Sequence, residues 1–196
     1  MKHPLTGADP GNNIGMNIPV FTYKFVPGDS VQMTFVAKGG GGELFGGSRY
    51  RVIAFGDGII GIEKFIIDSY IDGVRGGAIC PPSIVGIGIG GTFDLSAKLA
   101  KEAAALRVIG SHHPEPQIAE IERNLFEALS ELKVGAMGCG GEISVLGVHV
   151  EYAHTHIAGL TVAMNTSCLI TRRAVARIHA SGQVEELDDP RWFDGR

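Results

Sequence analysis

Two cysteines stand in segments whose residue types suit metal chemistry. Cys80 precedes a Pro-Pro pair, and an apolar run leads from there to the glycine cluster Gly86-Ile-Gly88-Ile-Gly90-Gly91. Cys168 follows a run that contains His154 and His156. Thiolates suit iron–sulfur clusters and zinc, and proline fixes the turn after Cys80 without adding an N–H donor. Both cysteines are therefore candidate ligands of a soft metal centre, although burial is the ordinary fate of a lone cysteine.

The histidines allow several interpretations. His154 and His156 are two residues apart, so on a strand their side chains would share one face. With the two cysteines they could form a Cys2His2 zinc site, but their spacing matches no zinc-finger pattern. A single histidine is more often a hydrogen-bonded core residue than a ligand. We expect His112 and His113, in a Pro-rich loop, to face solvent. Cys139 lies in a glycine turn, where its apolar neighbours favour burial and a third thiolate ligand is the alternative.

Two glycine-rich segments could present backbone N–H groups to an anion. The run Gly39–Gly42 is either a flexible loop or a nest of N–H groups that binds a carboxylate. Gly86, Gly88 and Gly91 formally match the dinucleotide fingerprint G-x-G-x-x-G. Two observations argue against dinucleotide binding. The helix after the glycines is followed by another helix and not by the second strand of a βαβ unit, and no acidic residue stands at a strand end about 20 residues further on to bind a ribose. We prefer a helix N-terminus that lies close to an anionic group.

Composition and charge predict one folded domain over residues 1–196. The hydrophobic content of 44% and charged content of 19% are those of a globular chain. A net charge of −4 without a basic stripe argues against binding to nucleic acid. No apolar run reaches about 18 residues, so we expect no membrane-spanning helix. Three cysteines without an export signal favour metal binding or burial over disulfides, and we expect a cytoplasmic location.

The hydrophobic periodicity predicts an α+β fold, with helices packed on a mixed or antiparallel sheet. The turn Pro27-Gly28-Asp29 predicts a hairpin between strands 18–26 and 30–38, followed directly by a glycine loop. Apolar residues at helical spacing predict helices at 58–73, 94–106 and 116–133. Further strands are expected at 83–89, 143–151, 158–164 and 173–179. This order favours a single α+β domain over a regular doubly wound sheet.

Together, these segments resemble the alpha region of the class I fumarase and tartrate dehydratase family of iron–sulfur hydro-lyases. The combination is specific, whereas any one motif alone is not. The matching stretches follow the family's order along nearly the whole chain: His3-Pro-Leu-Thr-Gly with Gly11-Asn-Asn13, Lys38-Gly-Gly-Gly-Gly42, Cys80-Pro-Pro with Val85–Thr92, Gly135-Ala-Met-Gly138 with Gly140-Gly141, and Thr155–Leu160 through Asn165 to Cys168 with Arg172-Arg173.

The resemblance implies a [4Fe–4S] cluster held by three cysteines, with one iron left open. Cys80 and Cys168 match two of those ligands. His156 matches the family's substrate-site histidine, which implies a catalytic and substrate-binding role. Gly41 and Gly42 match a loop whose backbone contacts a substrate carboxylate. The implied reaction is the reversible hydration or dehydration of a small dicarboxylate, with fumarate and malate first and tartrate or mesaconate next.

The resemblance also implies that other polypeptides complete the enzyme. The family's first cluster cysteine lies upstream in a Cys-Gln-Asp segment, and its catalytic base lies in a C-terminal beta region. This sequence contains neither segment. We expect a hetero-oligomer containing a dimer, in which partner subunits supply the third cysteine and the beta region. Cys139 as a substitute ligand is the alternative. A non-catalytic structural or regulatory subunit and a zinc-binding protein are two further hypotheses.

Overall fold

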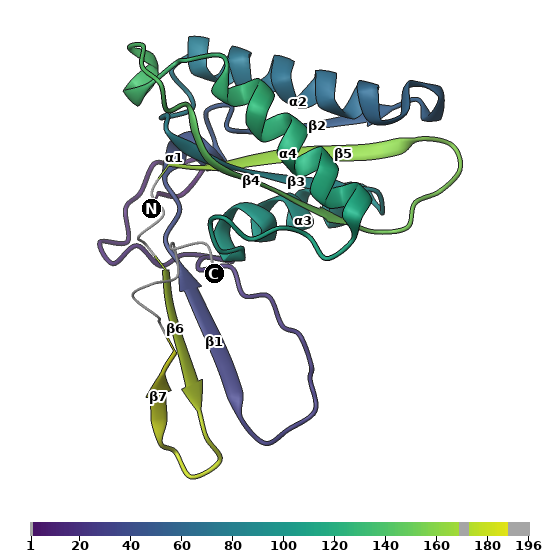
Figure 1. Ribbon diagram of the computed structural model, residues 1–196. Helices are drawn as coiled ribbons and strands as arrows, with labels where there is room; N and C mark the ends of the chain where they lie inside the picture. The colour runs from purple at the N-terminus through teal and green to yellow at the C-terminus, as the bar shows by residue number, and fades with distance from the viewer. Residues whose placement is uncertain (1, 169–172, 188–196) are drawn as a thin grey trace.

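The computed structural model describes residues 2–168 and 173–187, and Figure 1 shows how their helices and strands are arranged. Short 3-10 turns at Phe55–Asp57 and Ala136–Gly138 join some of these elements. In chain order the elements are β1 (Val31–Val36), α1 (Gly40–Glu43), β2 (Ser48–Ile53), α2 (Gly58–Arg75), β3 (Ser83–Ile89), α3 (Phe93–Leu106), α4 (Pro116–Ser130), β4 (Val145–Tyr152), β5 (Leu160–Ser167), β6 (Arg173–Ile178) and β7 (Val184–Glu186).

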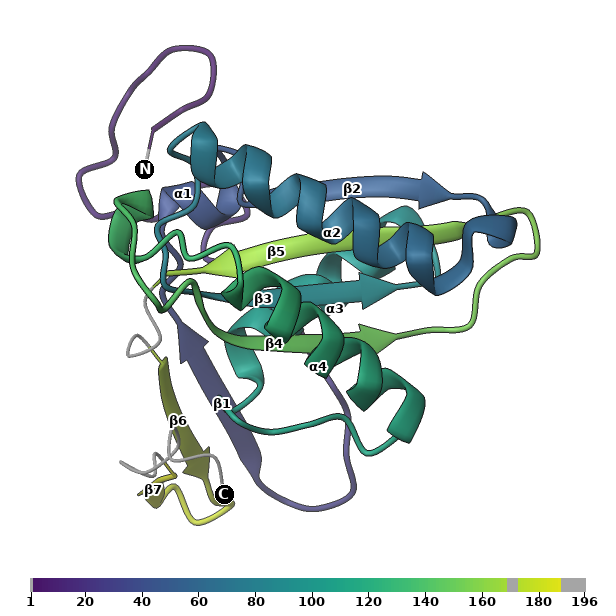
Figure 2. The same cartoon turned by 45° about the horizontal axis from the view of Figure 1, so that its top comes forward.

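The larger sheet has the strand order β2-β5-β3-β4. Strands β3 and β4 are parallel, and β5 runs antiparallel to both β3 and β2. Helices α2 and α4 cover one face of this sheet, and α3 covers the other (Figures 1 and 2). The arrangement is the mixed-sheet α+β fold that the hydrophobic pattern predicts. Among the described residues, no helix is long and apolar enough to cross a bilayer.

The residue pattern of β3 explains how three layers pack around it. Large side chains alternate with glycines, so that Val85 and Ile87 face α2 and α4 while the glycines face α3. A Cβ at Gly86 would overlap the carbonyl oxygen of Ala100, and one at Gly88 would overlap that of Ser96. The glycines thus let α3 lie directly on the strand, and this packing accounts for the part of the dinucleotide-like pattern within β3.

The smaller sheet has the order β1-β6-β7 and projects away from the main body (Figure 1). The predicted hairpin between 18–26 and 30–38 is wrong. Residues 18–26 form no strand, and β1 pairs instead with β6, with Val31 opposite Ile178. The turn at Pro27-Gly28-Asp29 is a local signal, whereas the true partner strand lies about 140 residues further along the chain. Lys24 instead forms a 2.8 Å ion pair with Glu102 of α3.

Most other predicted elements are confirmed within a few residues. The three long helices and the strands β3 to β6 lie where the periodicity places them. The prediction of a loop at the glycine run is wrong, because Gly40–Glu43 forms the short helix α1. Strand β2 was not predicted and pairs with β5 along its whole length.

Candidate functional site

The two candidate metal ligands lie side by side at one end of the larger sheet. Cys80 is three residues before β3, and Cys168 directly follows β5. The two strands are antiparallel neighbours, and Ile84 pairs with Ser167, so the cysteines meet at the same end. Partial burial raises the pKa of the Cys80 thiol, and the adjacent Cys168 raises it further through its charge and a hydrogen bond. Both thiols remain partly accessible, which makes them available to an external soft metal centre.

A buried ammonium group lies beside this thiol pair. The side chain of Lys38 is only 7% exposed, and its Nζ donates to Asn165 Oδ1 at 2.5 Å and to the Thr166 carbonyl oxygen at 2.6 Å. Burial lowers the pKa of Lys38, and the charge of Glu43, 3.4 Å away, partly offsets that effect. Lys38 is therefore a buried cation and not a solvated surface residue. The nearby Cys168 also opposes the lowering of the Lys38 pKa.

Glu43 joins the buried lysine to α3. Its carboxylate accepts a 2.8 Å hydrogen bond from Lys101 and lies 3.4 Å from the Lys38 ammonium. Burial is the largest influence on the pKa of Glu43 and favours the neutral acid. The hydrogen bond from Lys101 and the two lysine charges outweigh burial, so the pKa of Glu43 is lowered. The site therefore contains an ionised Glu43 between two cations.

The glycines of α1 are packed tightly between β5 and the segment before Cys80. A Cβ at Gly41 would lie 2.7 Å from the carbonyl oxygen of Ala78, and a Cβ at Gly42 would overlap that of Thr166. A Cβ at Gly39 would lie 3.8 Å from the Cys168 sulfur. The glycine run thus approaches the thiol pair through its backbone. The packing explains why these residues are glycines whether or not they also contact a substrate.

His156 lies at the opposite end of the larger sheet. It is on the loop between β4 and β5, whose course Figure 2 shows. Its exposed ring accepts a hydrogen bond from the Ala158 N–H at 3.1 Å. The seven residues of β3 separate this end from the thiol pair, a span of about 23 Å at 3.3 Å per residue. His154 is on the same loop. The hypothetical zinc site of Cys80, Cys168 and these histidines is therefore ruled out within one copy of the chain.

Cys139 is exposed, which corrects its expected burial. Its turn follows α4 and packs near the thiol pair, since the Met137 N–H donates to the Pro81 carbonyl oxygen at 2.8 Å. No three His, Cys, Asp or Glu side chains in the described part of the chain gather closely enough to hold a metal ion. Cys139 therefore does not complete a three-ligand set with Cys80 and Cys168 in this arrangement.

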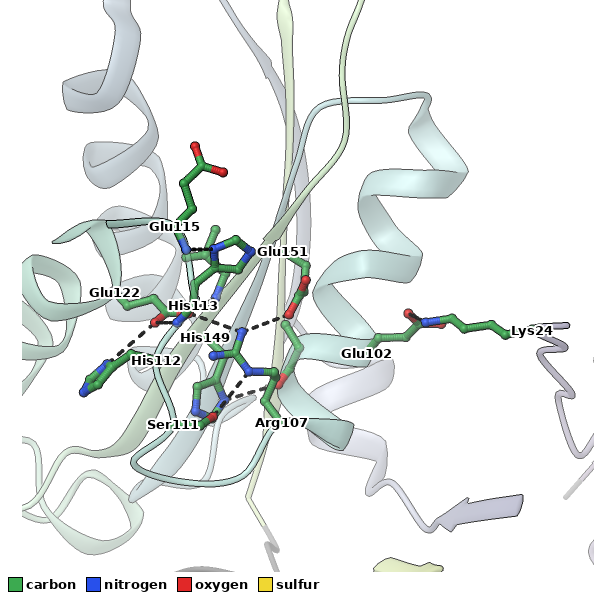
Figure 3. A network of polar contacts seen from close by, with 12 residues as sticks. Lys24, Glu102, Arg107, Ser111, His112, His113, Glu115, Glu122, His149 and Glu151 are labelled. Carbon is green, nitrogen blue, oxygen red and sulfur yellow. Dashed lines mark hydrogen bonds and ion pairs between the residues drawn. The ribbon is translucent and has the colours of Figure 1, made fainter. Parts of the chain in front are cut away.

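A second polar cluster, which sequence reasoning missed, lies where the α3–α4 loop meets β4 (Figure 3). Its centre is the fully buried Glu122. The carboxylate accepts hydrogen bonds from the N–H groups of His113 and Val150, each 2.9 Å long, and lies 3.5 Å from Arg107. Strand β4 is an edge of its sheet, so Glu122 satisfies a backbone donor that would otherwise be unpaired. The only sequence signal is a glutamate among the buried positions of α4.

The three histidines of this cluster differ in burial, and their contacts hold the loop and strand in place. His112 is 59% exposed, as expected, whereas His113 is half-buried. His149 is buried on β4 with its Nδ1 3.3 Å from the Ala103 carbonyl oxygen. Burial, followed by the charge of Arg107, lowers the pKa of His149 to about 4. This cluster fixes the loop against the sheet and lies apart from the thiol pair.

Comparison with known proteins agrees with the resemblance seen in the motifs. The family model "Fumarate hydratase (Fumerase)" matches residues 1–177. The chain is 40% identical over 178 residues to the "Putative L(+)-tartrate dehydratase subunit alpha" of Methanocaldococcus jannaschii, covering 90% of this chain and 61% of that protein. It is 37% identical over 182 residues to the L(+)-tartrate dehydratase subunit alpha of Escherichia coli (strain K12), covering 92% and 58%.

The chain therefore spans about three fifths of the length of these relatives. The matched region extends past both cysteines, the glycine run and the histidine loop. The paired thiols at the end of an α+β sheet, together with these matches, establish that the chain belongs to the fumarate hydratase (Fumerase) family.

Proposed function

We propose that this chain is a subunit of a cytoplasmic [4Fe–4S] hydro-lyase that adds water to, or removes it from, a small dicarboxylate. The observation that carries the proposal is the adjacency of Cys80 and Cys168, beside the backbone of Gly39 and the ammonium of Lys38, in a member of this family. Two neighbouring, partly accessible thiols are a suitable donor set for two corners of an iron–sulfur cluster. A partner subunit supplies the third cysteine.

The residues near the thiol pair have distinct roles in this proposal. When bound, the cluster supplies an iron with an open position, which acts as a Lewis acid on the substrate's hydroxyl group. The first-turn N–H groups of α1, at Gly41 and Gly42, have no acceptor within the helix and orient a substrate carboxylate. Lys38 adds a positive charge beside the site that attracts the bound dianion. The base that moves the carbon-bound proton belongs to the partner beta region.

His156 enters this proposal only through an assembly of several copies. About 23 Å of sheet separates it from the thiol pair, which is too far for one small dicarboxylate to contact both. We therefore assign its substrate-site role across an interface, where His156 of one copy approaches the thiol pair of another. Assembly with a beta subunit, which the designation of the relatives as subunit alpha suggests, gives a hetero-oligomer that contains this dimer.

The name of the family model and the names of the relatives suggest different dicarboxylates as the substrate. The family model is named for fumarate hydratase, whereas the relatives at 37–40% identity are named L(+)-tartrate dehydratase subunits. Identity to named relatives is closer support than a family name, so L(+)-tartrate ranks above fumarate and malate here, with mesaconate next. All four have two carboxylates and differ in the groups around the reacting carbons.

Turnover by the anaerobically reconstituted complex tests the proposal. Chain and partner subunits are loaded with iron and sulfide, and the dehydration of L(+)-tartrate and of malate is followed. Cys80→Ala and Cys168→Ala should each abolish turnover, while the matched control Cys139→Ala keeps it. Full activity in either of the first two variants would reject that ligand. A correctly assembled complex without iron and without turnover would favour a non-catalytic subunit.

A further inference from the structure

Strand β1 is an open edge of the smaller sheet. In the order β1-β6-β7, β6 lies on one side of β1, and no strand of the described residues pairs with its other side. Residues 20–24 lie across a pocket of about 350 Å³ from the side chains of Gln32, Thr34 and Val36. They form no ladder with the strand. The backbone groups on the outer side of β1 are therefore available for pairing.

The hydrogen bonds of β6 show which of its residues face β1. In an antiparallel ladder, the N–H and C=O of one residue point to the same side of the strand. The Leu187 N–H donates to the Val175 carbonyl oxygen at 2.9 Å, so Val175 points towards β7. The backbone N–H and C=O groups of its neighbours Ala174 and Ala176 consequently point towards β1.

The register then identifies the free groups on β1. Phe35 lies opposite Ala174 and Met33 opposite Ala176, so these residues are hydrogen-bonded to β6. Val31, opposite Ile178, is hydrogen-bonded to β6 in the same way. Gln32, Thr34 and Val36 alternate with them. Their backbone N–H and C=O groups point to the open edge.

Strand β1 itself contains none of the residues that usually protect an exposed strand, although residues 20–24 lie across the pocket from it. Its sequence, Val-Gln-Met-Thr-Phe-Val, has no charge and no proline, and its side chains at Val31 and Phe35 are 61% and 62% exposed. The opposite edge, β7, is only three residues long and contains Glu185 and Glu186. Charged side chains and short length commonly protect an edge strand against strand addition, so β1 is the less protected of the two edges of this sheet.

The end of β1 leads to the thiol pair. Lys38, two residues after the strand, donates to the carbonyl oxygen of Thr166, two residues before Cys168. A Cβ at Gly39 would lie 3.8 Å from the Cys168 sulfur. A strand added along β1 would therefore have one of its ends at the two cysteines.

We propose that the open edge of β1 binds, by strand addition, an extended uncharged segment of the polypeptide that supplies the third cluster cysteine. The inference rests on the proposed function, because that function requires a third thiolate from elsewhere. The relatives have room for such a segment, since this chain matches only 61% of the M. jannaschii protein. Main-chain hydrogen bonds to Gln32, Thr34 and Val36 give the affinity, and the position of β1 brings the added cysteine to Cys80 and Cys168.

Binding measured without iron tests this docking edge. The partner subunits that complete the complex, purified without iron, serve as the partner polypeptide. Thr34→Pro removes one outward N–H while leaving the β1–β6 ladder intact, because edge strands tolerate proline there. Glu186→Pro is the matched control on the outer side of β7. The wild type and Glu186→Pro should bind equally, and Thr34→Pro should bind at least about tenfold more weakly.

Amide hydrogen exchange gives a second readout that does not depend on a variant's folding. In the complex, the amides of Gln32, Thr34 and Val36 should gain protection, whereas those of Met33 and Phe35 are protected already. Equal binding by Thr34→Pro, no binding by the wild type, or a β1-paired dimer of this chain alone would overturn the inference. Because iron is absent, these results are independent of cluster formation, and the hydro-lyase proposal stands or falls separately through the Cys80 and Cys168 variants.

Discussion

At the residue scale, His149 makes the stability of the fold depend on pH. Its pKa of about 4 in the fold lies below the ordinary value of 6.5, so the unfolded chain binds the proton more readily. The fold favours the neutral imidazole, so the fold has its full stability above pH 6.5 and loses stability as the pH falls towards 4. Linkage predicts a loss of about 2.5 kcal/mol in unfolding free energy between pH 7 and pH 4.5. Urea unfolding at both pH values measures it, and in His149→Gln that part of the pH dependence should disappear; an unchanged difference would contradict the assignment.

Gly42 is the most closely packed glycine of the candidate site. A methyl group there would overlap the Thr166 carbonyl oxygen, so we expect Gly42→Ala to lower the unfolding free energy by about 2 kcal/mol. The matched control is Gly40→Ala in the same helix, where the new Cβ would lie 3.4 Å from the Phe45 ring. Alanine is favoured over glycine in helices, so the control should be neutral or stabilising. Chemical denaturation compares the two, and equal stabilities would mean that α1 is not held against β5.

At the scale of elements, the contact between α3 and β3 depends on glycines in the strand. Gly86→Ala would push a methyl group into the α3 backbone at Ala100, so we expect a loss of about 3 kcal/mol and faster amide exchange in α3. Gly56→Ala is a suitable control, because nothing lies within 4 Å of its new Cβ. If α3 kept its protection in Gly86→Ala, the close approach of helix and strand would be wrong.

The elements also show what the sequence alone can predict. Helices α2 and α4 have strong apolar periodicity, and β3 is an apolar run bounded by turns, so local pattern suffices for them. The pairing of β1 with β6 is a contact across about 140 residues, and no local signal competes with the apparent hairpin at Pro27-Gly28-Asp29. Strand β2 contains Arg49 and Arg51 and lies at a sheet edge, which obscures its alternation.

At the scale of the whole molecule, the sequence indicates candidate residues but not how the fold arranges them. Cys80 and Cys168 are candidate ligands by residue type and motif, and the antiparallel pairing of β3 and β5 brings them together. The same pairing puts His156 at the far end, because its loop enters β5 from the other side. Glu122 was missed because a buried carboxylate is recognised only from its backbone partners.

The separation of His156 from the thiol pair predicts complementation between inactive copies. If each site combines the cysteines of one copy with His156 of another, mixing His156→Ala with Cys168→Ala subunits gives mixed dimers with one intact site. Random exchange should then restore about a quarter of wild-type turnover, since half of the dimers are mixed and each has one working site of two. Each variant alone, reassembled in the same way, is the control. If mixing restored no turnover, His156 would not act at the thiol pair of another copy.

The binding of iron and sulfide tests most directly whether Cys80 and Cys168 hold a cluster. Iron and acid-labile sulfide are measured in the anaerobically reconstituted complex of the wild type, Cys80→Ser, Cys168→Ser and Cys139→Ser. We predict about four of each per site in the wild type and in Cys139→Ser, and less than about a tenth of that in the other two variants. Full iron and sulfide content in Cys80→Ser and Cys168→Ser would contradict the account.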